Sequence, residues 1–263
     1  MQSFYIPRAV SNILRSHFSG FPVVFHHVPK CGGSSLSECL RNKYFFSYFT
    51  LSPRAIINTA MDLNSDLNHS SVSSESYNLG EKILLYNLYE DRLCVQGHFR
   101  YSEKAFDIFQ EKYKFITILR DPISQFLSHY FYNTQSSEKR WRIDSSIDEF
   151  IDSEAAKNYG EYFILYFSGL PQDADFSSDE AIQRAKKNIE NLHAIGFLDD
   201  MPTFEKTLSS ILNLNISISH LNKNPVDKRN RDSQITKRIL KKVEDVCAPN
   251  LQLYYHARSL FKL

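Results

Sequence analysis

A short apolar stretch at residues 114–119 (KFITIL), followed by Arg120, Asp121 and Pro122, constrains the fold more than any other segment. Its β-branched and aromatic residues fall on both faces, which predicts a strand buried on both sides. Such strands are typical of parallel sheets whose two faces are covered by helices. The chain is therefore expected to supply helices between its strands.

The segments around this strand follow that scheme. Residues 22–27 are a second short apolar run, and residues 35–43 predict a helix after it, with Leu36 and Leu40 spaced four apart. Further strands are predicted at residues 92–96 and 193–197. Further helices are predicted at residues 81–90, 102–111, 121–133, 177–192, 202–212, 233–246 and 250–261.

This alternation predicts a single α/β domain over residues 1–263, P-loop-like, with a central, mostly parallel sheet and helices on both faces. Residues 64–78 are rich in Ser and Asn and lack periodicity, so they predict a surface insertion or mobile loop. In this architecture, binding sites lie at the carboxyl ends of the strands.

Charge and cysteine usage narrow the functional classes. The formal net charge is +1, so no global basic field favours nucleic acid or anionic lipid, and any anion site must be local. The four cysteines are scattered without a CxxC pair, which favours free thiols in a reducing compartment. The first 25 residues lack a signal-peptide core or an apolar stretch near 20 residues, so we expect a soluble, cytoplasmic protein, unless an N-terminal anchor has been removed.

The turn after the first strand has the composition of an anion site. Gly32 and Gly33 stand where a strand turns into a helix, and glycines there let the backbone approach an anion. The N–H groups that open the helix would point at the anion, Ser34 and Ser35 add hydroxyl donors, and Lys30 adds positive charge. The alternative interpretation is that GGSS is only a tight turn and helix cap.

The nucleoside triphosphate P-loop, GxxxxGK[ST], is the main competing motif. The sequence does not match it, because no lysine stands between Gly33 and Ser34 and the nearest lysine, Lys30, precedes the glycines. The loop is therefore predicted to bind a phosphate or a sulfonated phosphate without the usual magnesium-holding residues. No metal is expected in the site.

A second anion site is predicted at the end of the central strand. Arg120 follows that strand, and Ser128 lies eight residues later, about two helical turns along the next helix. A guanidinium could turn back beside the Ser128 hydroxyl and share one phosphate with it. The alternative is a surface arginine paired with Asp121. Two anion sites at neighbouring strand ends would fit a nucleoside with a phosphate at each end.

These motifs resemble those of the PAPS-dependent sulfotransferases, where PAPS is 3'-phosphoadenosine 5'-phosphosulfate. The 5'-phosphosulfate loop of that family resembles HHVPKCGGSSL, and its 3'-phosphate motif resembles LRDPISQFLSHY. The Gly-His segment of its carbohydrate sulfotransferases, closest to the heparan sulfate 2-O-sulfotransferase-like group, resembles VQGHF. Weaker downstream segments are similar to HAIGFLDDMPTFEKTL and LYYHARSLF, so the resemblance runs in order from Val23 to Phe261, apart from residues 64–78.

The resemblance implies transfer of a sulfuryl group from PAPS to an acceptor hydroxyl, with PAP (3',5'-ADP) as product. Lys30 would contact the 5'-phosphosulfate and stabilise the leaving phosphate, and His98 would be the general base. Arg120 and Ser128 would bind the 3'-phosphate. The backbone of the loop would hold the phosphosulfate through Cys31, Gly32, Gly33, Ser34 and Ser35.

Downstream, Lys228 or Arg229 in NKNPVDKRNR would close over the nucleotide. Two positions depart from the family pattern: Cys31 replaces the more usual Thr, and Gln125 stands where a second Arg often occurs. The acceptor is predicted to be a carbohydrate, from the resemblance and from the aromatic residues near positions 44–49 and 130–132.

Other interpretations remain open at this point. A nucleotide kinase or other P-loop phosphotransferase would require Mg²⁺ and ATP. A catalytically silent nucleotide- or glycan-binding module would keep Arg120 and Ser128 and tolerate loss of Lys30 and His98. The adjacent His26 and His27 must face opposite sides of their strand, so they are predicted to be structural.

Overall fold

Parallel strands form the centre of the molecule. The structure is a computed structural model that describes residues 8–63, 69–219 and 234–260. The strands are β1 (Val23–His26), β2 (Tyr48–Leu51), β3 (Cys94–Gly97), β4 (Lys114–Leu119) and β5 (Ala194–Phe197). They form one five-stranded sheet in the order β2-β3-β1-β4-β5, with every neighbouring pair parallel. The predicted α/β fold with a parallel central sheet is confirmed.

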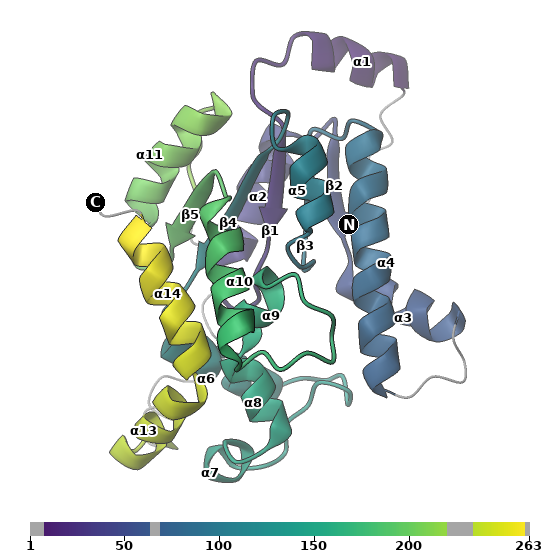
Figure 1. The fold of residues 1–263 in the computed structure, drawn as a ribbon. Helices are drawn as coiled ribbons and strands as arrows, with labels where there is room; N and C mark the ends of the chain where they lie inside the picture. The colour runs from purple at the N-terminus through teal and green to yellow at the C-terminus, as the bar shows by residue number, and fades with distance from the viewer. Residues whose placement is uncertain (1–7, 64–68, 220–233, 261–263) are drawn as a thin grey trace.

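Helices flank the sheet, and in Figure 1 α10 and α5 lie in front of it while α2 lies behind. The helices are α1 (Arg8–Ser16), α2 (Gly33–Lys43), α3 (Pro53–Leu63), α4 (His69–Tyr89), α5 (Glu103–Phe109), α6 (Pro122–Asn133), α7 (Ile147–Phe150), α8 (Glu154–Gly160), α9 (Tyr162–Phe167), α10 (Asp179–Glu190), α11 (Met201–Leu212), α13 (Lys237–Val246) and α14 (Ala248–Leu260). None of the helices in the described ranges is long and apolar enough to cross a membrane.

The two central strands owe their position to burial on both faces. All four residues of β1 are buried, and so are five of the six residues of β4. Phe25, Phe115 and Ile116 are at most 1% exposed. Burial of a side chain of this size stabilises the fold by about 1.5–3 kcal/mol, which is why both segments read as continuous apolar runs in the sequence.

Local capping signals set where several helices begin. The Ser102 side chain accepts a hydrogen bond from the Ala105 N–H at 3.0 Å at the start of α5. The Asp121 carboxylate accepts from the Ser124 N–H at 2.8 Å at the start of α6, where Pro122 occupies the first turn. These caps satisfy N–H groups that lack partners within a helix, so the predicted starts of both helices agree with the structure to within a residue.

Residues 64–78 were expected to be a surface insertion or mobile loop, and the loop alternative is wrong for residues 69–78, which form the first half of α4; residues 64–68 lie outside the described residues. Ser and Asn are poor helix formers, so the local sequence gave no helical signal here. The helix packs against α3 and β2. Tertiary packing of this kind supplies most of a helix's stability and overrides weak local propensity.

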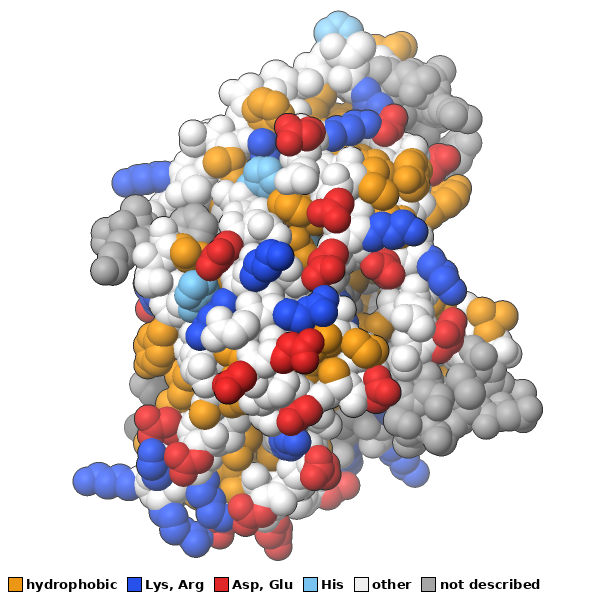
Figure 2. All heavy atoms as spheres, in the orientation of Figure 1, with side chains coloured by type: hydrophobic (Ala, Val, Ile, Leu, Met, Phe, Trp, Pro, Cys, Tyr) orange, Lys and Arg blue, Asp and Glu red, His pale blue; other side chains and the backbone are white. Residues whose placement is uncertain are grey.

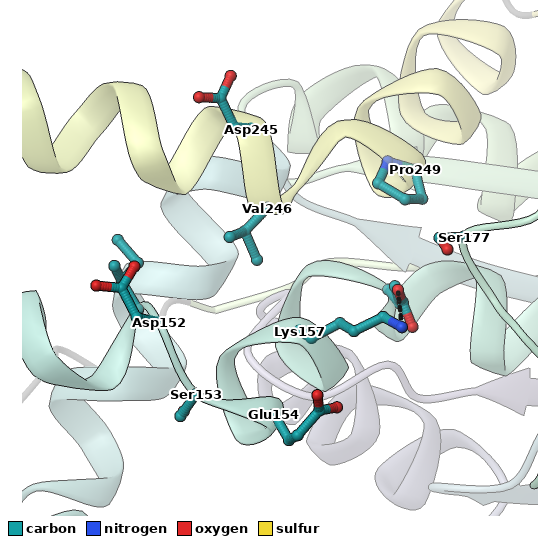
Figure 3. A pocket seen from close by; sticks show the side chains of 10 residues that line it. Asp152, Ser153, Glu154, Lys157, Ser177, Asp245, Val246 and Pro249 are labelled. Carbon is teal, nitrogen blue, oxygen red and sulfur yellow. Dashed lines mark ion pairs between the residues drawn. The ribbon is translucent and has the colours of Figure 1, made fainter.

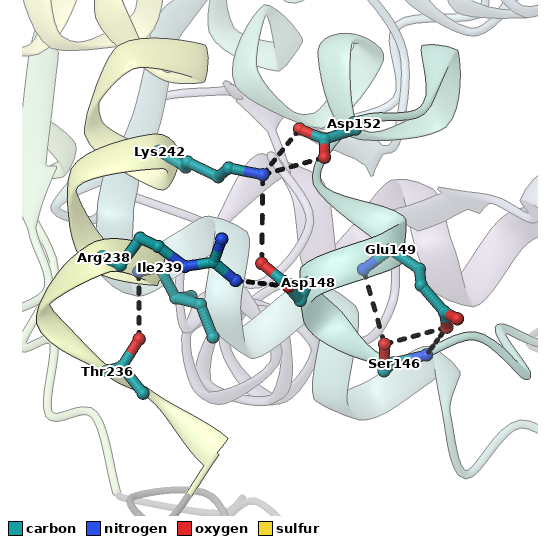
Figure 4. A network of polar contacts seen from close by, with 8 residues as sticks. All are labelled: Ser146, Asp148, Glu149, Asp152, Thr236, Arg238, Ile239 and Lys242. Carbon is teal, nitrogen blue, oxygen red and sulfur yellow. Dashed lines mark hydrogen bonds and ion pairs between the residues drawn. The ribbon is translucent and has the colours of Figure 1, made fainter.

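A second, smaller core lies under α6, α7, α8 and α13, with Phe126, Phe150 and Val243 among its buried members. Ion pairs at its edge join α13 to α7, where Arg238 and Lys242 meet acidic residues of the segment 148–152 (Figure 4). These pairs are largely exposed, so each contributes under about 1 kcal/mol. The apolar contacts therefore hold α13 in place.

Acidic and basic side chains are interspersed over the face shown in Figure 2, without a large area of one sign. The mixture agrees with the net charge of +1. An anion site, if the protein has one, therefore depends on local arrangement rather than on a general field.

Candidate functional site

Three predicted site residues follow three neighbouring strands. Lys30 comes after β1, His98 after β3 and Arg120 after β4, and β1 pairs with both of the other strands. Within the sheet, His26 at the end of β1 is aligned with Gly97 of β3. Because the strands are parallel, their carboxyl ends meet at one edge of the sheet, which is where α/β proteins bind ligands.

The structure brings Lys30 and Arg120 together. The Arg120 guanidinium donates a hydrogen bond from Nη1 to the Lys30 carbonyl at 3.3 Å. Burial, and then the charge of Arg120, lower the pKa of Lys30 from 10.5 to about 8. Among the described residues, no carboxylate lies within ion-pair distance of the Lys30 ammonium. An anion bound here would relieve the repulsion between the two cations.

The ammonium of Lys30 has an aromatic partner instead. Its Nζ lies 3.5 Å from the centroid of the Tyr132 ring, a cation–π contact from α6. The backbone of Lys30 is left-handed, with φ of 64°, an uncommon conformation for a residue with a side chain. Such backbone strain is concentrated at functional sites, where the surrounding structure holds it in place.

The two loop glycines are required by their neighbours. Gly32 has φ of 82°, and a Cβ on it would lie 2.4 Å from Cδ1 of Leu198. A Cβ on Gly33 would lie 2.3 Å from Cδ2 of the His27 ring. The sequence interpretation assigned these glycines to close approach of an anion, whereas the structure shows protein side chains against them.

The helix that follows the loop still offers donors. Gly32 is the N-cap of α2 and provides no side-chain hydrogen bond to the first turn. The N–H groups at a helix start point outward and favour an anion, more so beside Lys30. Ser34 is exposed, Ser35 is partly exposed and Cys31 is fully buried.

His98 is oriented by the main chain just after the end of β1. Its Nδ1 lies 2.5 Å from the carbonyl oxygen of His27. A carbonyl can only accept, so Nδ1 carries the hydrogen and Nε2 keeps a lone pair. Burial lowers the pKa of His98, against a smaller upward effect of that hydrogen bond. The ring is therefore neutral at pH 7, in the form that a general base needs.

His27 contributes to the site in a way that the sequence did not indicate. Its ring centroid lies 4.4 Å from that of His98, and burial followed by His98 lowers the pKa of His27 to about 3. The His26 ring lies instead among aromatic rings, 4.9 Å from Phe99. The adjacent rings therefore have different surroundings, and His27 packs between the general-base candidate and the glycine loop.

Two residues of α6 were missed as site residues by the sequence interpretation. Gln125 is fully buried and donates from Nε2 to the Pro29 carbonyl at 3.2 Å, which ties α6 to the loop after β1. His129 is influenced electrostatically by Lys30 and by His98. Their spacing could have indicated this, because Gln125 and His129 are four positions apart, and residues four apart lie on the same face of a helix.

Other predicted residues stand apart from this arrangement. Ser128 lies on α6 and is 9% exposed, and its shared phosphate with Arg120 stays a prediction. Lys228 and Arg229 lie outside the described residues. Tyr130, expected among the acceptor aromatics, is buried in the smaller core and donates its hydroxyl hydrogen bond to the Ser145 carbonyl at 2.9 Å.

A surface hollow of about 340 Å³ lies between α8 and the junction of α13 and α14 (Figure 3). Its lysine, Lys157, is already paired with Glu161 at 3.8 Å. None of the predicted site residues lines it. The chemistry therefore favours the strand ends as the candidate site.

The sequence was compared with known proteins. No family model matches it, and a search of curated proteins found no match either. The geometry of the strand ends is therefore the basis on which a function can be argued.

Proposed function

We propose that this protein transfers a sulfuryl group from PAPS to an acceptor hydroxyl, as a sulfotransferase. The observation that carries the proposal is the grouping of Lys30, Arg120 and a neutral His98 at the ends of three adjacent parallel strands. Two crowded cations favour a ligand with more than one anionic group. A neutral histidine after the neighbouring strand β3 favours removal of a proton from the acceptor.

The nucleotide would bind through both cations. Lys30 and the first N–H groups of α2 would hold the 5'-phosphosulfate, and Arg120 with Ser128 would hold the 3'-phosphate. The planar guanidinium matches phosphate oxygens, and a lysine supplies a point charge. The absence of a lysine after Gly33 disfavours a magnesium-dependent triphosphate site.

The transfer step uses the two assigned residues in different ways. The acceptor oxygen forms a bond to sulfur while the bond between sulfur and the bridging 5'-phosphate oxygen breaks, and the electron pair leaves with that oxygen. His98 Nε2 takes the proton from the acceptor hydroxyl. Lys30 faces the charge that develops on the leaving phosphate. Preorganised stabilisation of this kind contributes several kcal/mol, and a general base about 10²–10⁴-fold in rate.

Calorimetric titration tests the nucleotide part of the proposal. We expect 3',5'-ADP to bind without Mg²⁺ and more tightly than ATP with Mg²⁺. Tighter binding of ATP with Mg²⁺ would favour a phosphotransferase instead. Transfer of radiolabelled sulfate from PAPS to a panel of glycans then tests the activity and the predicted carbohydrate acceptor.

A matched variant separates binding from chemistry. His98→Ala is expected to bind 3',5'-ADP within about threefold of wild type and to lose about 10²–10⁴-fold in transfer rate. Transfer at the wild-type rate would remove His98 from the mechanism. Nucleotide binding without transfer to any acceptor would favour the non-catalytic module.

A further inference from the structure

One face of α6 lies against the loop that follows β1. Gln125 donates to the Pro29 carbonyl at 3.2 Å, and the Tyr132 ring lies 3.5 Å from the Lys30 ammonium. His129 is four residues after Gln125 and three residues before Tyr132, so the three side chains share one face of the helix. His129 is therefore on the face of α6 that lies against this loop, between two residues that contact it.

Ring contacts fix the orientation of His129. It stacks on Tyr159 with 3.9 Å between centroids and 6° between planes, and it meets the edge of Tyr162 at 5.5 Å and 88°. Burial, then Lys30 and His98, lower the pKa of His129 to about 3. The ring is therefore neutral at physiological pH and close enough to Lys30 for the charge of that ammonium to lower its pKa.

The hydrogen of the neutral ring has a preferred position. Nδ1 of His129 is buried and has no hydrogen-bond partner. Buried N–H groups without an acceptor are rarer in proteins than buried acceptors that lack a donor, so the hydrogen is better placed on Nε2. Any hydrogen bond from this ring to a ligand then runs from Nε2, which acts as a donor.

We propose that His129 donates a hydrogen bond from Nε2 to an oxygen of the sulfuryl group that is transferred. This inference rests on the proposed function and adds a contact to the transferred group itself. A neutral donor suits the position, because a further cation there would be repelled by Lys30. A ring held by contacts with two tyrosines can keep the sulfuryl group aligned for in-line transfer without reorganising.

The test compares two nucleotides that differ only in the sulfuryl group, PAPS and 3',5'-ADP, in the absence of acceptor. His129→Phe keeps a ring to stack on Tyr159 and removes both nitrogens. We expect its affinity for 3',5'-ADP to stay within about twofold of wild type and its affinity for PAPS to fall about three- to tenfold, the effect of one neutral hydrogen bond. Turnover should fall about tenfold or more.

Two further variants complete the test. His129→Gln places an amide N–H near the position of Nε2 and should recover most of the PAPS affinity, which a purely structural role would not predict. His256→Phe, a histidine-to-phenylalanine change on α14, is the matched control and should alter neither affinity. Thermal unfolding of each variant confirms that it folds.

The outcomes distinguish this inference from the proposed function. Equal losses for both nucleotides in His129→Phe, or an unchanged affinity for PAPS, would overturn the contact to the sulfuryl group while the sulfotransferase proposal stands. If the wild-type protein binds neither nucleotide, the proposed function fails and this inference fails with it.

Discussion

The affinity for a doubly phosphorylated nucleotide should depend on pH through Lys30. Burial and Arg120 lower the pKa of Lys30 to about 8, so this lysine loses its proton in a range where most lysines stay charged. A phosphate dianion beside the ammonium stabilises the charged form and raises the pKa again. Binding of the nucleotide is therefore linked to protonation of Lys30, and affinity must fall as pH rises above 8.

The magnitude follows from the fraction of free protein with a charged lysine. With a pKa of about 8, this fraction is about 0.9 at pH 7 and about 0.1 at pH 9. If the bound nucleotide restores the usual lysine pKa, affinity for 3',5'-ADP falls roughly tenfold between these values. A lysine of ordinary pKa would give almost no change over the same range.

Three other titratable groups around the site have pKa values far from the range between pH 7 and pH 9. Burial lowers the pKa of His27 and of His129 to about 3 and raises the pKa of the Cys31 thiol to about 12. The second ionisation of a phosphate monoester lies near pH 6, so the charge of the ligand is almost constant. The change in affinity for 3',5'-ADP between pH 7 and pH 9 is therefore assigned to the loss of the proton of Lys30.

Calorimetric titration of 3',5'-ADP at several pH values measures the effect. In buffers of different ionisation enthalpy it also counts protons, and about half a proton should be taken up per nucleotide at pH 8. Lys30→Arg supplies the matched control, because an arginine stays protonated and should flatten the dependence. The reasoning would be refuted if Lys30→Arg still loses affinity about tenfold between pH 7 and pH 9, or if the affinity of the wild-type protein does not change over this range.

Three further predictions concern the neighbours of the site. Gly33→Ala should lower the free energy of unfolding in urea by about 1–3 kcal/mol, because its Cβ would meet the His27 ring at 2.3 Å. Combined with His27→Ala, Gly33→Ala should cost less of that free energy, and strict additivity of the two changes would contradict the contact. Tyr132→Ala should move the midpoint of the pH dependence of 3',5'-ADP affinity down by less than about one pH unit, because the ring stabilises the charged form of Lys30. Tyr132→Phe keeps the ring and should not move it. A midpoint that Tyr132→Ala leaves unchanged would argue against the cation–π contact. Thr117→Val should cost about 1 kcal/mol in urea unfolding, because the buried hydroxyl donates to a β1 carbonyl at 2.8 Å, and a neutral result would mean that this carbonyl is satisfied without it.

The sequence alone predicted those parts of the fold that depend on local chemistry. Strands β1 and β4 are recognisable because burial on both faces requires continuous apolar residues. The starts of α5 and α6 are recognisable because Ser102 and Asp121 cap free N–H groups. By contrast, β2 and the first half of α4 carried weak local signals and depend on packing against neighbours.

The sequence also predicted that Lys30, His98 and Arg120 each follow a strand, because the end of a strand can be recognised from local sequence alone. It did not determine which strands are neighbours, and Lys30 and Arg120 are 90 positions apart in the chain. Only the strand order β3-β1-β4 puts their loops side by side at one edge of the sheet. The same packing turns the face of α6 that carries His129 toward them. Contacts between distant segments, which no local pattern encodes, therefore decided the electrostatics of the site, including the lowered pKa of its lysine.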